Sequence, residues 1–247
     1  MPRASGKFTL WMVLLAAVFA GFVLLGNWQV RRYHLKLRIS HEMQTRVHAA
    51  PVPAPGPADW PHAERMQYLH VELRGRYLAG AQTLVRGASR DGYGFWVMSP
   101  LQTDRGFIVL VNRGYIPDSL PAQPAFARIK PATNEVALTG LLRASEPRGG
   151  FLRHNQPEKN LWYSRDVAAI AAAQDLPVGK VAPYFVDADA DDDAGSNPWP
   201  MAGLTNVRIY NHSLGYAITW YLLALGTALA AGIVVRHERQ LRDPQRH

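Results

Sequence analysis

The chain has 247 residues, no cysteine and a formal charge of +8 at pH 7. The absence of cysteine excludes disulfides, zinc ribbons, thiolate metal relays and the covalent attachment motif CxxCH. The positive charge is confined to the ends, since residues 41–207 carry a net charge of −1 and the remainder +9. This excess lies beside two long apolar stretches. It therefore favours contact with membrane lipids or an anionic ligand at the membrane, and it argues against nucleic acid.

The first apolar stretch contains 20 consecutive uncharged residues, from Phe8 to Asn27. This length is sufficient to cross a bilayer. No small-residue cleavage site follows it, and only seven residues precede it, which is too few for an Arg-rich organelle presequence. We therefore expect a short cytoplasmic segment (1–7), an uncleaved transmembrane helix (8–28) and a bacterial inner membrane as the location.

A juxtamembrane helix and a proline-rich linker are expected over residues 29–62. The apolar pattern predicts that the helix continues to about Ala50, and residues 49–61 contain too few apolar side chains to pack. His34, His41 and His48 recur at seven-residue intervals. Ligands of one metal on a helix prefer a spacing of four, so these histidines are interpreted as surface residues.

The middle of the chain, residues 63–205, changes to a period of two, which is typical of half-buried strands. A short turn at residues 103–106 predicts that its two flanking strands are antiparallel neighbours. The expected fold class is an integral membrane protein in which two transmembrane helices flank an α+β, mainly antiparallel β domain, either an open sheet or a small barrel. Strands are predicted at residues 68–74, 82–86, 94–99, 107–113 and 135–142.

Two further segments complete this domain. Residues 164–174, SRDVAAIAAAQ, have an N-cap residue and an acidic first turn, which predict a helix. Residues 187–195, DADADDDAG, lack the glycine and glutamate of a calcium-binding EF-hand loop and are interpreted as a solvated loop.

The second apolar stretch predicts a transmembrane helix over residues 212–235, followed by a tail at 236–247. His212, Tyr216 and Thr219 follow one another at four and three residues, so on a helix they share a face with Leu223. An ionisable residue at the end of a transmembrane helix indicates a functional site. The alternative is an aromatic belt with an interfacial histidine facing water.

Positive charge predicts the orientation of the chain. Arg236, Arg239, Arg242 and Arg246 follow the second span, so both termini are expected in the cytoplasm and the middle domain in the periplasm. The first span disagrees, because more cations follow it than precede it. We interpret those cations as snorkelling or as contacts for an anionic ligand. They are Arg31, Arg32, Lys36 and Arg38.

No serine-nucleophile elbow, HExxH motif, phosphate loop or dinucleotide fingerprint occurs, so we expect no enzyme. Four segments instead resemble the Surfeit-locus family of cytochrome c oxidase assembly factors, over residues 26–224. One position departs from the family pattern, since Leu35 stands where tryptophan is common. The segments are GNWQVRRYHLK (26–36), VNRGYIP (111–117), TGLLRASEPRGGFLRHNQPEKNLWYSRD (139–166) and NHSLGYAITWY (211–221).

The resemblance implies a role in placing haem a into subunit I of haem–copper oxidase, with haem a synthase as a further possible partner. His212 matches the family's histidine and would be the iron ligand. Tyr216 and Thr219 would line the ring, and Arg31, Arg32 and Lys36 would receive the propionates. Asn112, Arg113 and Gly114 are expected to fix a strand-end turn. The alternative function is a membrane-anchored scaffold that stabilises an oxidase intermediate and binds no cofactor.

Overall fold

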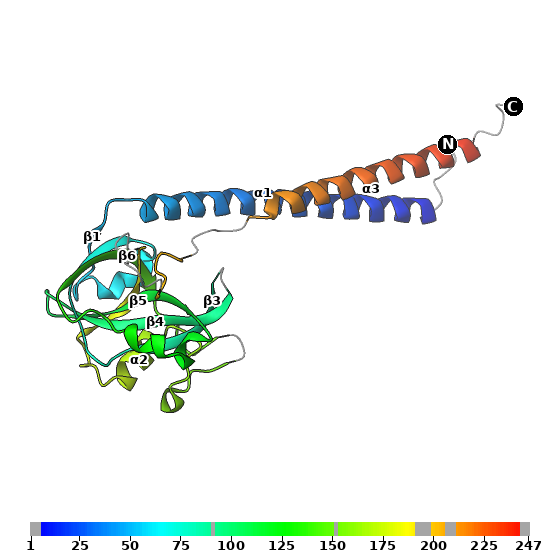
Figure 1. Ribbon diagram of the computed structural model, residues 1–247. Helices are drawn as coiled ribbons and strands as arrows, with labels where there is room; N and C mark the ends of the chain where they lie inside the picture. Colours follow the sequence, from blue (N-terminus) through cyan, green and yellow to red (C-terminus); the bar gives the residue numbers. More distant parts are fainter. Residues whose placement is uncertain (1–5, 90–91, 151–152, 191–198, 206–210, 243–247) are drawn as a thin grey trace. The chain divides into compact units, whose positions relative to one another are not determined.

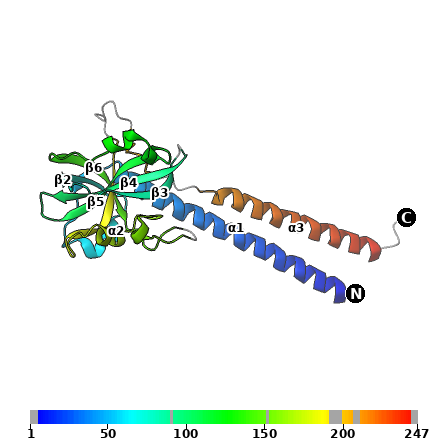
Figure 2. The same ribbon diagram turned by 60° about the horizontal axis from the view of Figure 1, so that its bottom comes forward.

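A computed structural model describes residues 6–89, 92–150, 153–190, 199–205 and 211–242. The chain folds as two compact units. One contains the two ends of the chain, Met1–Glu42 and Arg208–His247, and the other is Met43–Val207. Figures 1 and 2 show the helices of the first unit and the sheet of the second.

The first unit is built from two long helices, α1 (Gly6–Val47) and α3 (Ser213–Arg242). Both are long and apolar enough to cross a membrane, and their apolar windows are almost wholly exposed. A core helix of a soluble protein would bury such an apolar surface. The exposed apolar side chains of α1 and α3 are instead compatible with the lipid interior of a membrane. The predicted span and juxtamembrane helix are one continuous helix, because α1 contains no proline or other helix-breaking sequence before Val47.

The second unit is a seven-strand sheet whose order is β1-β2-β6-β7-β5-β4-β3. An additional β2–β4 pairing joins the ends of the inner five strands and closes them into a small barrel. The closure requires Gly75, because a side chain there would collide with the backbone of Gln102. The strands are β1 (Val52–Pro53), β2 (His70–Tyr77), β3 (Thr83–Ser89), β4 (Gly92–Thr103), β5 (Ile108–Pro117), β6 (Val136–Ala144) and β7 (Val181–Ala188).

Alternate side chains fill the inside of the barrel. Val71 and Leu73 of β2 pack there with Val109 and Val111 of β5. The intervening residues face outward, and a second cluster on the outside of the sheet includes Met98, Leu110, Phe185 and Trp162. Helix α2 (Val167–Ala173) covers this cluster with Val167 and Ile170. The period of two in the sequence thus separates an inner core from an outer core.

The five predicted strands are confirmed as β2 to β6, and residues 103–106 join antiparallel β4 and β5 as expected. Strand β7 was missed, and it runs parallel to β5 while it pairs antiparallel with β6. Its sequence VAPYFVDA is buried at four successive positions, so it shows no clear alternation.

The expectation that residues 49–61 do not pack is wrong. Val52 and Pro53 form β1 beside β2, and Ala54, Pro55 and Gly56 are buried. A 3-10 helix, Trp60–Met66, follows. Trp60 donates from Nε1 to the Pro55 carbonyl at 3.3 Å, and its ring meets Phe107 edge to face. The sequence contains few apolar residues here, but one tryptophan and the backbone are sufficient to dock the segment.

The helix predicted over residues 164–174 begins later, at Val167. Asp166 is its N-cap, and its carboxylate accepts from the Ala169 amide at 3.1 Å. Ser164, which the sequence suggested as the cap, is buried and donates to the Glu146 carbonyl at 2.6 Å. Three short 3-10 helices, Leu120–Ala122, Pro124–Arg128 and Pro157–Lys159, complete the elements of this unit.

Candidate functional site

Helices α1 and α3 pack against each other in antiparallel directions. Phe22 stacks on Trp220 with 5.8 Å between ring centroids. At the other end of the contact, the Asn211 side-chain amide donates to the Tyr33 carbonyl at 3.2 Å. Residue numbers rise along one helix as they fall along the other, so each residue of the α1 contact face lies beside a particular part of α3.

The packed faces consist mainly of small and aromatic residues, with one glutamine. Ser213, Ala217 and Ala224 are buried on α3, and Gly26 and Gln29 are buried on α1. Small residues allow two helix backbones to approach closely in a membrane. The helix pair therefore has a defined contact face, and the remaining faces are open.

The predicted site residues of α3 lie beside this contact face. Tyr216 and Thr219 come one residue before the packed Ala217 and Trp220, and both are exposed. His212 is also exposed but lies just before the helix, which begins at Ser213. His212 occupies the N-cap position, one residue before the start of α3, since its carbonyl accepts the first helical hydrogen bond, from the Tyr216 amide at 3.4 Å.

On α1, Arg32 comes one residue before Tyr33, and its guanidinium lies 5.3 Å from the centroid of the Trp28 ring. Trp28 itself comes one residue before the buried Gln29. Lys36 is half-buried one turn after Arg32. Arg31 has a different position around the helix, because it comes two residues after the buried Gln29 and is therefore rotated about 200° from it. Arg31 therefore lies on the face turned away from α3.

Residues that come just before a packed position lie on the same side of the helix pair in α1 and in α3. Such a residue is rotated about 100° from the contact face, always in the same direction around its own helix. Because the two helices are antiparallel, these rotations bring the residues of both helices to one side of the pair. Residues that come just after a packed position lie on the other side. Tyr221 and Asn27 show this, because they follow Trp220 and Gly26 and their side chains hydrogen-bond at 2.7 Å.

We call the first side the histidine flank. It combines an exposed imidazole, exposed aromatic rings and two cations at one end of the helix pair. It includes five of the six expected binding residues, which come from α1 and α3 at adjacent levels, and Trp28 joins them. Arg31 is not on this flank. The members of the flank are Trp28, Arg32, Lys36, His212, Tyr216 and Thr219.

Gln29 is a further polar residue that the sequence did not single out. It is 8% exposed at the helix contact, and its Oε1 has no hydrogen-bond partner within the described ranges. A buried amide without a partner is costly, particularly between apolar helices. Its position within an otherwise ordinary helical sequence gave no signal of this burial.

The separated motifs of the barrel unit meet at one carboxylate. Asp187 is buried at the end of β7 and pairs with Arg143 at 2.9 Å and Arg165 at 3.2 Å. It also accepts from the Asn112 amide at 2.7 Å and the Thr205 hydroxyl at 3.0 Å. The interpretation of residues 187–195 as a solvated loop is therefore wrong for Asp187, and residues 191–195 lie outside the described ranges.

Asn112, Arg113 and Gly114 also differ from their expected role. They lie inside β5, not in a turn at its end. The pairing of β4 with β5 shifts by one residue at this point, which is a β-bulge. Gly114 has φ of 131°, a conformation that favours glycine, and accepts no side chain because the Met201 backbone lies against it.

Glu146 extends the cluster around Asp187. Burial opposes its charge, but hydrogen bonds from Arg165, one of them at 2.5 Å, outweigh burial and lower the pKa of Glu146. Burial likewise opposes the charge of Arg165, and Glu146 and Asp187 outweigh it and raise the pKa of Arg165. Two arginines and two carboxylates thus neutralise one another, which identifies the cluster as a structural tie between β5, β6, β7 and the segment that precedes α2.

Comparison with known proteins agrees with these motifs. A model of the SURF1 family matches residues 16–225. The chain is similar to Surfeit locus protein 1 of Homo sapiens, with 33% identity over 239 residues that cover 90% of this chain and 76% of that protein. It is 32% identical over 220 residues to Surfeit locus protein 1 of Rattus norvegicus, covering 83% and 69%.

A SURF1-like protein of Monosiga brevicollis is 30% identical over 227 residues, which cover 87% of this chain and 83% of that protein. The matched region includes most of α1, the first part of α3 and the whole barrel unit. It also includes every motif of the resemblance and all residues of the histidine flank. The chain therefore belongs to the SURF1 family, the Surfeit-locus family of oxidase assembly factors.

Proposed function

We propose that this protein is a membrane-anchored assembly factor that holds haem a on the histidine flank and assists its transfer to subunit I of haem–copper oxidase. The observation that supports the proposal most strongly is the convergence of His212, Arg32 and Lys36 on one side of the α1–α3 pair. Membership in the family is the reason for proposing an oxidase as the target, and the chemistry of the flank is the reason for proposing haem a as the ligand.

The residues of the flank fit the chemistry of haem a. Its iron takes an axial imidazole, which His212 could donate from an exposed position. Its apolar body suits the exposed rings of Trp28 and Tyr216 in an apolar solvent. Its two propionates suit Arg32 and Lys36, which can make charge-assisted hydrogen bonds. Arg31 is omitted from this proposal because it lies on the opposite face of α1.

The iron-ligand assignment is tested by purifying the full chain from cells that make haem a and recording its Soret band. We expect His212→Ala to lose the band while membrane insertion is unchanged. His34→Ala is the matched control, since His34 is an exposed histidine that comes just after Tyr33 and so lies on the other side of the pair. An unchanged spectrum in the His212 variant would refute the assignment and favour a scaffold without a cofactor.

The two neighbouring arginines provide a second test of the same flank. Arg32→Gln should weaken haem retention by at least about tenfold, because a charge-assisted hydrogen bond contributes about 1.5–3 kcal/mol. Arg31→Gln removes the same charge one residue away and should retain haem as the parent does. Retention is measured as the rate of haem loss to an excess of an acceptor protein. Equal losses in the two variants would contradict the placement of the propionates.

A further inference from the structure

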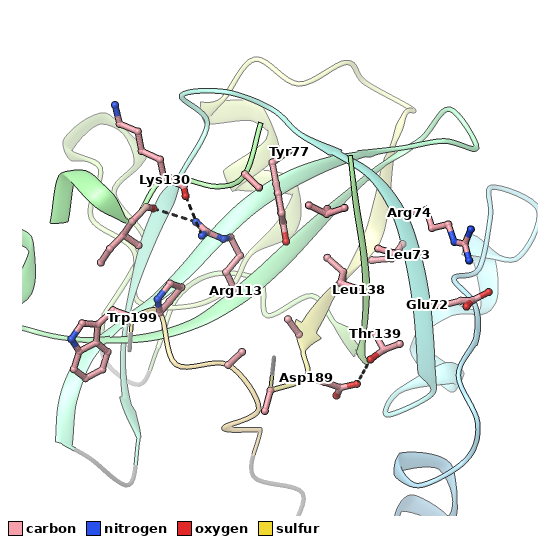
Figure 3. Close-up of a pocket in the computed structure, with 18 residues that line it drawn as sticks. Glu72, Leu73, Arg74, Tyr77, Arg113, Lys130, Leu138, Thr139, Asp189 and Trp199 are labelled. Atoms are coloured by element: carbon pink, nitrogen blue, oxygen red, sulfur yellow. Dashed lines mark hydrogen bonds between the residues drawn. The ribbon is translucent and has the colours of Figure 1, made fainter. Parts of the chain in front are cut away.

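A groove of about 630 Å³ lies at one end of the barrel, which is within the size range of small-molecule sites. Its walls come from β2 and β6, and residues near 130 and 200 cover its rim (Figure 3). All of these residues belong to the second unit. The groove is therefore a property of the barrel and does not involve the histidine flank.

The floor of the groove is the barrel core. Leu73 and Tyr77 occupy positions of β2 that face inward with Val71, and Leu138 of β6 packs against the same inner cluster. Ile129 and Trp199 add apolar surface at the rim. The groove thus opens directly onto apolar side chains, unlike a surface cleft between polar loops.

Arg113 projects into this apolar space from the β-bulge in β5. Its guanidinium lies 5.6 Å from the centroid of the Tyr77 ring (Figure 3). Bulges re-aim side chains, and this one depends on the glycine that follows. Burial lowers the pKa of Arg113 from its ordinary value, although the group remains a cation at neutral pH.

Arg113 differs from the other buried arginines of the barrel in its partners. Among the described residues it donates to neutral oxygens, those of the Gln82 side chain at 3.4 Å and the Ile129 and Lys130 carbonyls at 3.2 and 3.4 Å. Arg143 and Arg165 each contact a carboxylate. In the part of the chain that the structure describes, no carboxylate lies within ion-pair distance of Arg113. A half-buried cation without a counter-charge is costly unless a ligand supplies one.

Tyr77 provides a second donor beside this cation. Burial raises the pKa of its phenol to about 12, so the hydroxyl keeps its proton at neutral pH. Lys130 lines the same rim. Two carboxylates also line the groove. Asp189, which directly follows β7, already accepts from Thr139 at 2.6 Å and His70 at 2.8 Å, and Glu72 is exposed on the outward face of β2. The donors around Arg113 therefore favour an anion on this side of the groove.

We propose that the open end of the barrel binds a small amphipathic anion. Its carboxylate or phosphate would lie against Arg113 and Tyr77, and its apolar part would cover Leu73 and Leu138. The competing explanation is structural: Arg113 would only fasten the segment at residues 129–130 to β5 through the two carbonyls. The two explanations predict different responses to ligand charge, which the following experiment measures.

Octanoate, octyl phosphate and octanol are titrated into the full chain in phosphatidylcholine nanodiscs, with empty nanodiscs as the calorimetric blank. We expect saturable 1:1 binding of at least one anion, about tenfold tighter than octanol. A preference for octanoate would identify a carboxylate ligand, and a preference for octyl phosphate a phosphate ester. Absence of saturable anion binding, or equal affinity for octanol, would overturn the proposal.

Three variants locate the site. Arg113→Gln should weaken anion binding about tenfold and leave octanol unchanged. Arg76→Gln is the matched control, because Arg76 is exposed on the outward side of the same strand as Tyr77 and does not line the groove. Ala188→Leu fills the groove without altering a donor, and should abolish binding of the anion. Thermal unfolding of each variant shows that it is folded, and equal affinity in the Arg113 and Arg76 variants would overturn the assignment.

Discussion

Asp187 is the residue on which the order of the barrel unit depends most directly. Its carboxylate is 3% exposed and faces two guanidiniums that are each 15% exposed. Removal of one partner from a buried ionic cluster leaves an uncompensated charge, which is far more costly than loss of a surface pair. The residues joined here are distant in sequence and come from several strands, so loss of the cluster would weaken the contacts between those strands.

We therefore expect Asp187→Ala to lower the free energy of unfolding by about 3–5 kcal/mol. The measurement is urea unfolding of the full chain, followed by tryptophan fluorescence. Asp118→Ala is the control, because Asp118 pairs with Arg86 at 3.3 Å but both side chains are well exposed. That variant should change stability by less than about 1 kcal/mol. Similar losses in the two variants would contradict the importance of burial.

His70 links stability to pH. Burial opposes its protonated form, but the Ala49 carbonyl at 2.7 Å and Asp189 at 2.8 Å outweigh burial and raise the pKa of His70 above 6.5. Its stabilising contribution is therefore complete below pH 6.5 and is lost as the pH rises through the folded-state value. Unfolding measured from pH 5.5 to 8.5 should show this decline, whereas His70→Gln should lack it. The exposed His62→Gln should retain it.

At the scale of elements, the pairing of α1 with α3 depends on close approach at Gly26. A Cβ atom there would lie 2.7 Å from Cε1 of Tyr221, whereas Gly21 of the same helix has open space around it. We expect Gly26→Leu to separate the helices near this level and Gly21→Leu to leave them paired. Both changes replace glycine by the same side chain, so they alter helix propensity and apolarity equally.

The pairing can be measured by disulfide formation, because the chain has no cysteine of its own. Cysteines are introduced at Tyr33 and Asn211, which meet at one end of the contact. Oxidative cross-linking should fall strongly in the Gly26 variant and persist in the Gly21 variant. Undiminished cross-linking with Gly26→Leu would show that the contact is not set by this glycine.

For the whole molecule, the arginines that follow the apolar part of α3, from Arg236 onward, predict that both termini are cytoplasmic and that residues 66–200 are periplasmic. The reason is that cations next to a span are retained on the cytoplasmic side. Reporters that are active only in the periplasm, fused at Ala58 and at His247, test this orientation. We expect activity only at Ala58. Activity at His247 would reverse the orientation and place the histidine flank at the other side of the membrane.

Some elements of this fold are determined by residues close together in the sequence, and others by contacts between distant residues. The two long apolar helices, five strands and the 103–106 turn follow from charge, period and glycine, because each depends on neighbours within a few residues. Strand β7 and the docking of residues 52–56 do not, because they are stabilised by partners far away in sequence. The sequence of β7 has no clear alternation, since elements on both of its faces bury residues 184–187 in succession.

The candidate site divides in the same way. The sequence by itself identified His212, Arg32 and Lys36, because a histidine and cations beside apolar helices are unusual whatever they contact. Only the tertiary structure decided that Arg31 faces away, since this depends on which side of α1 meets α3. It also decided that Asp187 is buried with two arginines, while Arg113 donates to neutral oxygens among the described residues. The sequence shows which residues are charged. Whether an opposite charge lies close enough to neutralise each of them depends on distances in space, and the closed barrel determines those distances.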